Sequence, residues 1–322
     1  MNEFFKSAIL EKTGASSLLE TEIIQELWSG YGQIIRLSLQ NADLNSVVVK
    51  HVCLPTNKKH PRGWNSEIGH QRKVKSYEVE TQWYQKYSHR SAARVPECIM
   101  VEVQNDEVLI VLEDLDENGY HLRKQHVDWK DVTACLRWLA QFHASFMDRA
   151  PDDLWEQGTY WHLATRPREL EALKDEKLRQ AAYAIDEKLS ACMHKTLVHG
   201  DAKLANFCFA ANGKVAAVDF QYVGGGCGMK DVAYFIGSCL TEGECERLEE
   251  QILDTYFAYL NHELGQRCES VEAEWRPLYR VAWADFHRFI KGWSPDHWKI
   301  NSYSERLTAE VIRNHVEILD GD

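Results

Sequence analysis

Three side chains that carry oxygen atoms lie close together between residues 197 and 221 of the chain. Asp201 ends the triplet His-Gly-Asp, Asn206 follows five positions later, and Asp219 comes at the end of an apolar run. Carboxylate and amide oxygens are the ligands that Mg²⁺ prefers, and a further carboxylate can take the proton of an acceptor hydroxyl. This pattern therefore suits magnesium-dependent transfer of a phosphoryl group.

A tight turn between Asn206 and Asp219 predicts that the chain folds back on itself there. Apolar runs flank Asn212-Gly213, and Asn-Gly is the strongest short-range signal for a β-hairpin. The loop that carries Asp201 and Asn206 then enters one strand and Asp219 follows the next, so we expect the three side chains to converge. Asp and Asn beside Gly are also ordinary turn residues, and the prediction depends on the whole pattern.

The sequence HGDAKLAN followed by VDFQ resembles the catalytic loop and metal motif of the aminoglycoside phosphotransferase and choline kinase superfamily. The motif order is most similar to the choline/ecdysteroid-kinase-like (CHK kinase-like) branch. The resemblance implies an α+β, bilobal protein-kinase-like fold, with a small, mainly β N-lobe at 1–115 that binds the nucleotide. A larger, mainly helical C-lobe at 116–322 would carry the catalytic loop and the substrate-binding helices. By this resemblance, Asp201 of this chain would be the catalytic base, and Asn206 and Asp219 would hold the Mg²⁺ that is bound to ATP.

Lys203 marks a departure from the family pattern, because many relatives carry an aromatic or other residue in this part of the loop. Its position in the motif places it close to the transferred phosphoryl group, where it could act in catalysis by neutralising charge in place of an arginine. A lysine that points to solvent is the alternative.

Lys50 and Glu80 are the candidates for the ion pair that positions a lysine on the α- and β-phosphates of ATP. Lys50 follows three valines on a predicted third strand, and an amine in apolar company needs an anion. Lys50 alone favours a lysine that extends to water, and the resemblance reverses this, because Lys50 stands where the family's strand-three lysine stands. Glu80 lies in a helix predicted from Tyr77 onward, and Glu78 is the competing partner.

Two further segments resemble nucleotide-binding parts of the family. Gly30 and Gly32 lie in the turn between the first two predicted strands and would cover the phosphates, although an ordinary hairpin turn explains a lone Gly-x-Gly equally well. Glu113 and Leu115 follow two strands predicted around Asn105-Asp106. They match the family's hinge, whose extended backbone would contact adenine.

Other segments predict local structure only. We expect a short helix within residues 1–22, and a basic loop over 54–76 in which Lys73 and Lys75 are candidate phosphate contacts. Helices are predicted at 129–148, where His143 is a core histidine, at 168–193, and at 244–264, 271–292 and 303–319.

The acceptor is predicted to be a small molecule. Only residues 222–231 connect VDFQ to Asp231 in the next helix, and no Ala-Pro-Glu motif follows, so a protein kinase's long activation segment is missing. Asp231 resembles the second Asp of the family's pattern, and the resemblance implies that it braces the catalytic loop by hydrogen bonds. A cationic acceptor is one alternative, held by tryptophans near Asp285 and Asp296 through cation–π attraction.

The composition excludes several classes of protein. A formal net charge of −12 argues against a nucleic-acid partner. No long apolar run predicts a membrane span, and the first residues do not resemble a secretory signal. Nine scattered cysteines without a C-x-x-C pair indicate a reducing, cytoplasmic location rather than a disulfide framework or zinc site.

These observations predict an ATP- and Mg²⁺-dependent phosphotransferase that moves the γ-phosphoryl group to a hydroxyl of a small molecule. Amino alcohols, aminoglycosides and sterol-like metabolites are the candidate acceptors, and the sequence does not choose among them. A non-catalytic regulator that keeps the kinase-like scaffold and binds a nucleotide or another ligand is the alternative. The sequence carries no signal for the oligomeric state.

Overall fold

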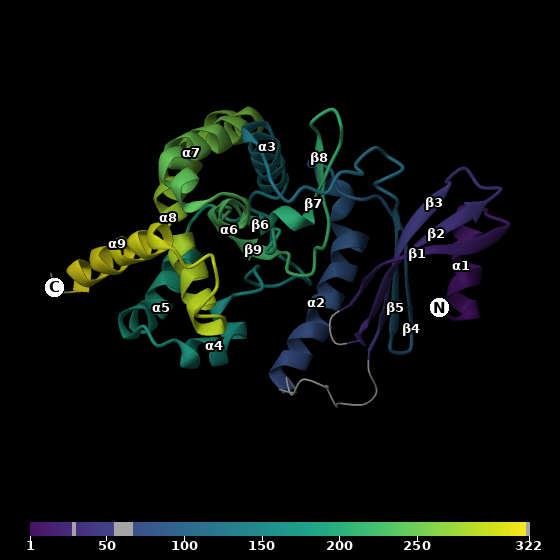
Figure 1. Ribbon diagram of the computed structural model, residues 1–322, viewed down its shortest axis with the longest axis horizontal. Helices are drawn as coiled ribbons and strands as arrows, with labels where there is room; N and C mark the ends of the chain where they lie inside the picture. The colour runs from purple at the N-terminus through teal and green to yellow at the C-terminus, as the bar shows by residue number, and fades with distance from the viewer. Residues whose placement is uncertain (28–29, 55–66, 320–322) are drawn as a thin grey trace. The chain divides into compact units, whose positions relative to one another are not determined.

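The computed structural model describes residues 1–27, 30–54 and 67–319, and the chain forms two compact units (Figure 1). The first unit contains Met1–Arg90, Arg94–Leu122 and Cys208–Val218, and the second contains Ser91–Ala93, Arg123–Phe207 and Asp219–Asp322. An antiparallel sheet dominates the first unit and helices dominate the second, so the predicted α+β class is confirmed. The predicted lobe boundary after residue 115 stays a prediction.

A five-stranded antiparallel sheet forms the body of the first unit, with the strand order β1-β2-β3-β5-β4. Alternate side chains of its strands face one apolar core, as in Ile35, Leu37, Val47 and Val49. The predicted strands around the Gly-Tyr-Gly turn and around Asn105 are confirmed. The strands are β1 (Ser17–Glu26), β2 (Gly32–Gln40), β3 (Ser46–Cys53), β4 (Cys98–Gln104) and β5 (Glu107–Glu113).

Helix α1 (Glu3–Thr13) packs on this core through Phe5 and Ile9. Asn2 caps its first turn, because its side-chain oxygen accepts a hydrogen bond from the backbone N–H of Phe5 at 3.0 Å. The helix predicted within residues 1–22 is therefore present, but it ends at Thr13, and β1 takes up the residues from Ser17 onward.

Helix α2 (Glu67–Lys86) begins ten residues before the predicted start at Tyr77. The prediction of a loop over 54–76 is thus wrong for residues 67–76. Its first half is rich in polar and basic residues, and this composition hides the apolar period by which a helix is recognised. Residues 55–66 of the predicted loop lie outside the described residues.

The predicted hairpin is present. Strands β7 (Phe207–Phe209) and β8 (Val215–Ala217) pair across the Asn212-Gly213 turn. The backbone N–H of Ala210 donates to the carbonyl of Lys214 at 2.8 Å. The hairpin packs within the first unit, because Cys208 and Ala216 form one apolar cluster with Leu115.

Helices and a short β-ladder make up the second unit (Figure 1). The helix predicted at 168–193 is two helices, because Asp175 caps a new start by accepting a hydrogen bond from the N–H of Leu178 at 3.1 Å. The other predicted helices are confirmed within a few residues. The elements are α3 (Trp129–Ser145), α4 (Pro167–Ala172), α5 (Glu176–Ser190), α6 (Met229–Cys239), α7 (Glu242–Leu264), α8 (Cys268–Trp293), α9 (Ser302–Leu319), β6 (Thr196–Val198) and β9 (Gly224–Gly226).

Short 3₁₀ turns complete the chain at Ser88–Arg90, Leu163–Thr165, Leu204–Asn206 and Gly265–Arg267. Over the described parts of the sequence, no helix combines the length and the apolar character that crossing a membrane requires. All nine cysteines are free thiols.

Candidate active site

Asp231, in the first turn of α6, holds the loop that leads to Asp201. Its two carboxylate oxygens accept the backbone N–H groups of His199 at 2.6 Å and Gly200 at 2.9 Å. His143 Nε2 lies 3.2 Å from the same carboxylate, and its Nδ1 contacts the hydroxyl of Tyr256 at 2.7 Å. The predicted brace is therefore present and acts on the backbone of the loop, and His143 is a core histidine as predicted.

Glycine is required at position 200. Its φ of +78° lies in the left-handed region, and a Cβ atom there would come within 2.1 Å of the carbonyl oxygen of Tyr222. The segment that leads to Asp201 thus passes directly against the backbone that follows Asp219.

Asp201 lies at the centre of a short hydrogen-bond network and is only 6% exposed. Its Oδ2 accepts from Lys203 Nζ at 2.9 Å and from Asn206 Nδ2 at 3.1 Å. Asn206 Nδ2 also donates to the backbone carbonyl of Asp201 at 2.7 Å. The second oxygen, Oδ1, is buried and has no hydrogen-bond partner among the described residues. A buried acceptor without a donor indicates a place for a ligand's donor.

Asp219 acts electrostatically on this network. Burial raises the pKa of Asp201, Lys203 opposes the rise, and the charge of Asp219 adds to it. Burial lowers the pKa of Lys203, but Asp201 and then Asp219 raise it above its usual value. The charge of Asp219 therefore acts on both members of the Asp201–Lys203 pair.

Asp219 itself adopts an uncommon backbone conformation. Its φ is +70°, in the left-handed region that Asp tolerates better than most residues. Gln221 Nε2 donates to its Oδ1 at 2.8 Å and orients the carboxylate. The chain therefore turns sharply at the residue that the sequence predicts as a metal ligand.

The donor set of this loop fits a hard divalent cation. Asn206 uses its Nδ2 for both hydrogen bonds, and no donor among the described residues contacts its Oδ1. An amide oxygen from Asn206 and the carboxylate of Asp219 are the oxygen ligands that suit Mg²⁺.

In the first unit, Lys50 and Glu80 form an ion pair, with Lys50 Nζ 2.6 Å from Glu80 Oε2. Lys50 is 5% exposed and Glu80 is 2% exposed, whereas the competing Glu78 is exposed. The lysine does not extend to water, because it is buried and paired. The predicted choice of Glu80 over Glu78 thus agrees with the contact.

The remaining predicted nucleotide contacts also lie in the first unit. Gly32 enters β2, where a Cβ atom would come within 2.0 Å of the carbonyl oxygen of His51, while Gly30 has open space around it. Glu113 is paired with Arg94 at 2.5 Å. The carbonyl oxygen of Leu115 accepts a hydrogen bond from the N–H of Tyr120 at 2.8 Å. This acceptor of the predicted hinge is therefore already bonded within the chain.

Lys73 and Lys75, predicted as phosphate contacts in a loop, lie on helix α2 instead. Lys73 Nζ lies 4.7 Å from the centroid of the Tyr77 ring, an adjacent turn of the same helix. This contact stabilises the helix by cation–π attraction, and a phosphate contact from either lysine stays a prediction.

Three residues that sequence reasoning missed lie near Asp201: Tyr160, Tyr234 and Lys299. The hydroxyl of Tyr234 donates to that of Tyr160 at 3.2 Å. Burial raises the pKa of both tyrosines, and the charge of Asp201 raises each further. Burial lowers the pKa of Lys299 to about 8. The charge of Asp201 raises this pKa, and the charge of Lys203 lowers it further. The only signal in the sequence is the aromatic and basic run from Trp293 to Lys299.

The tryptophans and acidic residues proposed as a cation site differ in their burial and in their contacts. Trp275 and Trp283 are core residues, whereas Trp293 and Trp298 are exposed. Asp285 is buried and already bound, to Arg288 Nη2 at 2.8 Å and to Trp161 Nε1 at 2.9 Å.

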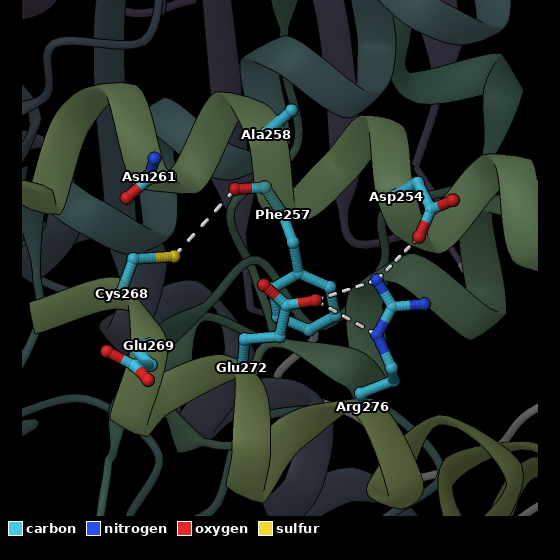
Figure 2. Close-up of a pocket in the computed structure, with 8 residues that line it drawn as sticks. All are labelled: Asp254, Phe257, Ala258, Asn261, Cys268, Glu269, Glu272 and Arg276. Carbon is cyan, nitrogen blue, oxygen red and sulfur yellow. Dashed lines mark hydrogen bonds and ion pairs between the residues drawn. The ribbon is translucent and has the colours of Figure 1, made fainter. Parts of the chain in front are cut away.

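Two other features outside this loop lack the character of an active site. Figure 2 shows a cavity of about 370 Å³ on α7 and α8, where Arg276 is neutralised by Asp254 and Glu272, each at 2.7 Å. None of the predicted site residues lines it. The lining residues are Asp254, Phe257, Ala258, Asn261, Cys268, Glu269, Glu272 and Arg276.

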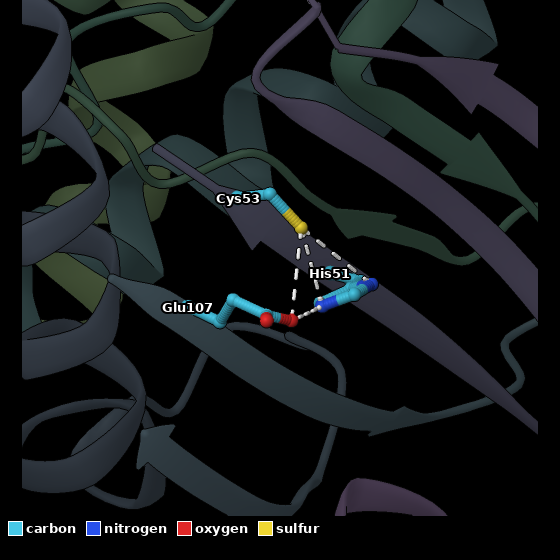
Figure 3. A group of neighbouring side chains, drawn as sticks. All are labelled: His51, Cys53 and Glu107. Atoms are coloured by element: carbon cyan, nitrogen blue, oxygen red, sulfur yellow. Dashed lines mark hydrogen bonds and ion pairs between the residues drawn. The ribbon is translucent and has the colours of Figure 1, made fainter. Parts of the chain in front are cut away.

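Figure 3 shows the second feature, the cluster of His51 and Cys53 on β3 with Glu107 on β5. His51 Nε2 lies 2.6 Å from Glu107 Oε2, which is a direct hydrogen bond. Ligands of a tetrahedral zinc ion stand about 3.3 Å apart, as bonds of about 2.0 Å require. The cluster is therefore a polar contact across the two strands.

Comparisons with known proteins agree with this geometry. The sequence model described as "Phosphotransferase enzyme family" matches residues 63–269. No curated protein sequence matches the chain significantly. Among solved structures, amicoumacin kinase hAmiN in complex with AMP-PNP, Ca²⁺ and Ami is 13% identical, with a TM-score of 0.55, and the alignment covers 97% of this chain and 95% of that one.

A second similar structure is the macrolide 2'-phosphotransferase MphH from Brachybacterium faecium. It is 12% identical, with a TM-score of 0.51, and the alignment covers 96% of this chain and 97% of that one. At these identities the two structures show the fold, and they confirm the predicted kinase-like architecture.

Proposed function

Because the chain belongs to the phosphotransferase enzyme family, we propose that it transfers the γ-phosphoryl group of ATP to a hydroxyl of a small molecule in the presence of Mg²⁺. The observation that carries this proposal is the buried Oδ1 of Asp201, which has no donor among the described residues although Asp219 and Asn206 stand beside it. Membership agrees with the resemblance to the aminoglycoside phosphotransferase and choline kinase superfamily, and the narrower branch stays a prediction.

Asp201 is the group that acts on the acceptor. Its Oδ1 accepts the hydroxyl hydrogen, the acceptor oxygen forms a bond to the γ-phosphorus, and the bond between that phosphorus and the β–γ bridging oxygen breaks. The products are the phosphorylated acceptor, ADP and a proton, which Asp201 releases. Lys203, held on Asp201 Oδ2 at 2.9 Å, is placed to offset negative charge on the transferred group.

Asn206 and Asp219 are the proposed ligands of Mg²⁺, which when bound neutralises charge on the ATP phosphates. Lys50 is proposed to bind the α- and β-phosphates. Glu80 fixes its ammonium at 2.6 Å, and a lysine buried to this degree needs an anionic partner. Gly30, Gly32, Glu113 and Leu115 stay candidates for contacts with the rest of the nucleotide.

Two features support a small acceptor. The chain from Gln221 to Asp231 is short, and its middle is fixed by the pairing of β9 with β6. It therefore leaves no long segment for holding a peptide. The two similar structures are an amicoumacin kinase and a macrolide 2'-phosphotransferase, so hydroxylated antibiotics belong in any screen beside amino alcohols and sterols. The nine free cysteines support a cytoplasmic location for the protein, because thiols stay reduced there.

The decisive experiment is Asp201→Asn, which keeps the size of the side chain and removes its basicity. We expect phosphoryl transfer to fall by about 10²–10⁴-fold, the contribution typical of general base catalysis, while binding of Mg-ATP is largely retained. Asp296→Asn, at an exposed position, is the matched control and should keep wild-type turnover. Undiminished turnover in Asp201→Asn would overturn the proposal, and ATP binding without transfer in the wild type would favour a non-catalytic regulator.

A further inference from the structure

Lys299, in the connection between α8 and α9, holds its ammonium among aromatic rings. Nζ lies 4.6 Å from the ring centroid of Tyr234, 5.2 Å from that of Phe286 and 5.6 Å from that of Trp298. No acidic side chain in the described part of the chain forms an ion pair with it. Lys291, a partly buried lysine of α8, contacts both Asp175 and Glu305 at 2.9 Å.

The contacts of the Lys299 ammonium replace only part of the hydration that it loses on burial. A lysine taken out of water loses hydration that must be replaced, and cation–π contacts return about 0.5–2 kcal/mol. Lys291 shows the usual solution, because two carboxylates neutralise it. Lys299 lacks such a partner, so an anion supplied from outside the chain would complete its surroundings.

Lys299 is also close to the proposed base. The charges of Asp201 and Lys203 both act on its ammonium, and Tyr234, whose ring it covers, responds to Asp201 as well. Tyr234 contacts Lys299 through its ring and Tyr160 through its hydroxyl. The three side chains therefore form one group, and the charge of Asp201 acts on each of them.

The balance of charge here opposes a cation. Lys203 and Lys299 are both positive, Asp201 is already paired with Lys203, and Asp219, the other carboxylate that acts on this pair, is the proposed ligand of Mg²⁺. Asp285, the buried acid on α8, is neutralised by Arg288. A cationic acceptor would therefore meet two ammonium groups, whereas an anionic acceptor would be attracted by both.

We propose that Lys299 binds an anionic group, a carboxylate or a phosphate monoester, of the hydroxyl-bearing acceptor, and that Tyr160 and Tyr234 contact the part between this group and the reacting hydroxyl. The inference rests on the proposed function, since it names the acceptor class of the same site. It replaces an amino alcohol or aminoglycoside with a hydroxy acid or a sugar phosphate as the expected substrate.

The first experiment measures binding without transfer. Wild-type protein with AMP-PNP and Mg²⁺ is heated in the presence of glucuronate, glucose 6-phosphate, glycerate, glucose, glucosamine or choline, each at the same ionic strength. We expect at least one anionic compound to raise Tm, with neutral and cationic compounds weaker. Carboxylate and phosphate compounds separate the two possible sources of the anion. Stabilisation by the cationic compounds alone, or by no anionic compound, overturns the proposal.

Variants then assign the effect to Lys299. Lys299→Met should lose the Tm shift by the anionic compound, Lys299→Arg should restore most of it, and Lys188→Met, at an exposed position on α5, should match wild type. Where transfer is measurable, Lys299→Met should raise KM for the anionic acceptor by about tenfold, or about 1.4 kcal/mol, with a change below about twofold in KM for ATP. An equal rise in KM for ATP would assign Lys299 to the nucleotide and overturn the proposal.

The two proposals fail separately. Binding of an anionic compound through Lys299 without any transfer would contradict the proposed function and leave only an anion-binding role for Lys299. Transfer to a neutral or cationic acceptor that Lys299→Met does not impair would support the proposed function and contradict the inference.

Discussion

Lys50 Nζ lies 2.6 Å from Glu80 Oε2, and both side chains are almost excluded from solvent. Removing one partner of a buried ion pair leaves an uncompensated charge, so we expect Lys50→Met to lower the free energy of unfolding by about 3–5 kcal/mol. Urea denaturation measures this change.

The double variant Lys50→Met/Glu80→Leu separates structure from function. It should recover much of the lost stability, because no lone charge remains, but isothermal titration calorimetry should still show weakened binding of Mg-ATP. Recovery of both stability and nucleotide affinity would mean that the pair has only a structural role.

Asp219→Ala should weaken the binding of Mg-ATP by removing a proposed oxygen ligand. Calorimetry measures the affinity for ATP once with Mg²⁺ and once with EDTA, and the difference between the two affinities is the contribution of the metal. This difference should be smaller in Asp219→Ala than in the wild type. Asp296→Ala serves as the control at an exposed carboxylate. An unchanged affinity for Mg-ATP in Asp219→Ala would count against a metal role.

Asp231→Ala should destabilise the catalytic loop, because the N–H groups of His199 and Gly200 would both lose their acceptor. Each buried unsatisfied donor costs about 1–3 kcal/mol, so the loss of two acceptors should lower the free energy of unfolding by about 2–6 kcal/mol. Chemical denaturation checks this value. Transfer should fall as well, and wild-type rates in a folded variant would show that the brace is dispensable.

The sequence was informative where a motif fixes both residue type and spacing. The hairpin between Asn206 and Asp219 was predictable from the local Asn-Gly turn. The Lys50–Glu80 pair and the brace by Asp231 were predictable from the positions that these residues take in the family's motifs. The fold class followed from the resemblance of HGDAKLAN and VDFQ to the phosphotransferase superfamily. What the catalytic and binding residues do stays a prediction.

The rest depends on contacts between distant parts of the chain. Lys299 lies in an irregular connection, and its surroundings come from Tyr234 and Phe286, which no local pattern joins to it. The early start of α2 was hidden because residues 67–76 are largely polar, so apolar period alone could not reveal a helix.

Gly32→Ala and Gly30→Ala form a matched pair. At Gly32 a methyl group would meet the His51 carbonyl oxygen at 2.0 Å, while at Gly30 it would meet nothing within 4 Å, and both positions have positive φ. We expect Gly32→Ala to lower Tm clearly more than Gly30→Ala in a thermal melt. Equal shifts would contradict the close approach of β2 to β3.

The binding of an anionic acceptor should depend on pH through Lys299. Burial lowers the pKa of Lys299 to about 8, with Lys203 lowering it and Asp201 and Cys239 raising it. Its ammonium is charged below that value and neutral above it, so KM for an anionic acceptor should rise as pH increases through about 8. Lys203 has a raised pKa and stays charged there.

Lys299→Arg supplies the control for this pH profile, because arginine keeps its charge throughout the range. Its KM should therefore stay level where that of the wild type rises. A wild-type KM that is constant between pH 7 and 9 would show that the charge on Lys299 does not contribute to acceptor binding.

The hairpin Cys208–Val218 packs in the first unit, while the residues on either side of it belong to the second. Severing the polypeptide after Leu122 would therefore strip Leu115 of its partners Cys208 and Ala216, and fragment complementation would need the hairpin supplied with the amino-terminal piece. The exposed Asn212-Gly213 turn is the natural place for new termini in a circular permutant. Such a permutant would keep the packing inside each unit, but Asn206 and Asp219 would no longer be joined by a continuous hairpin.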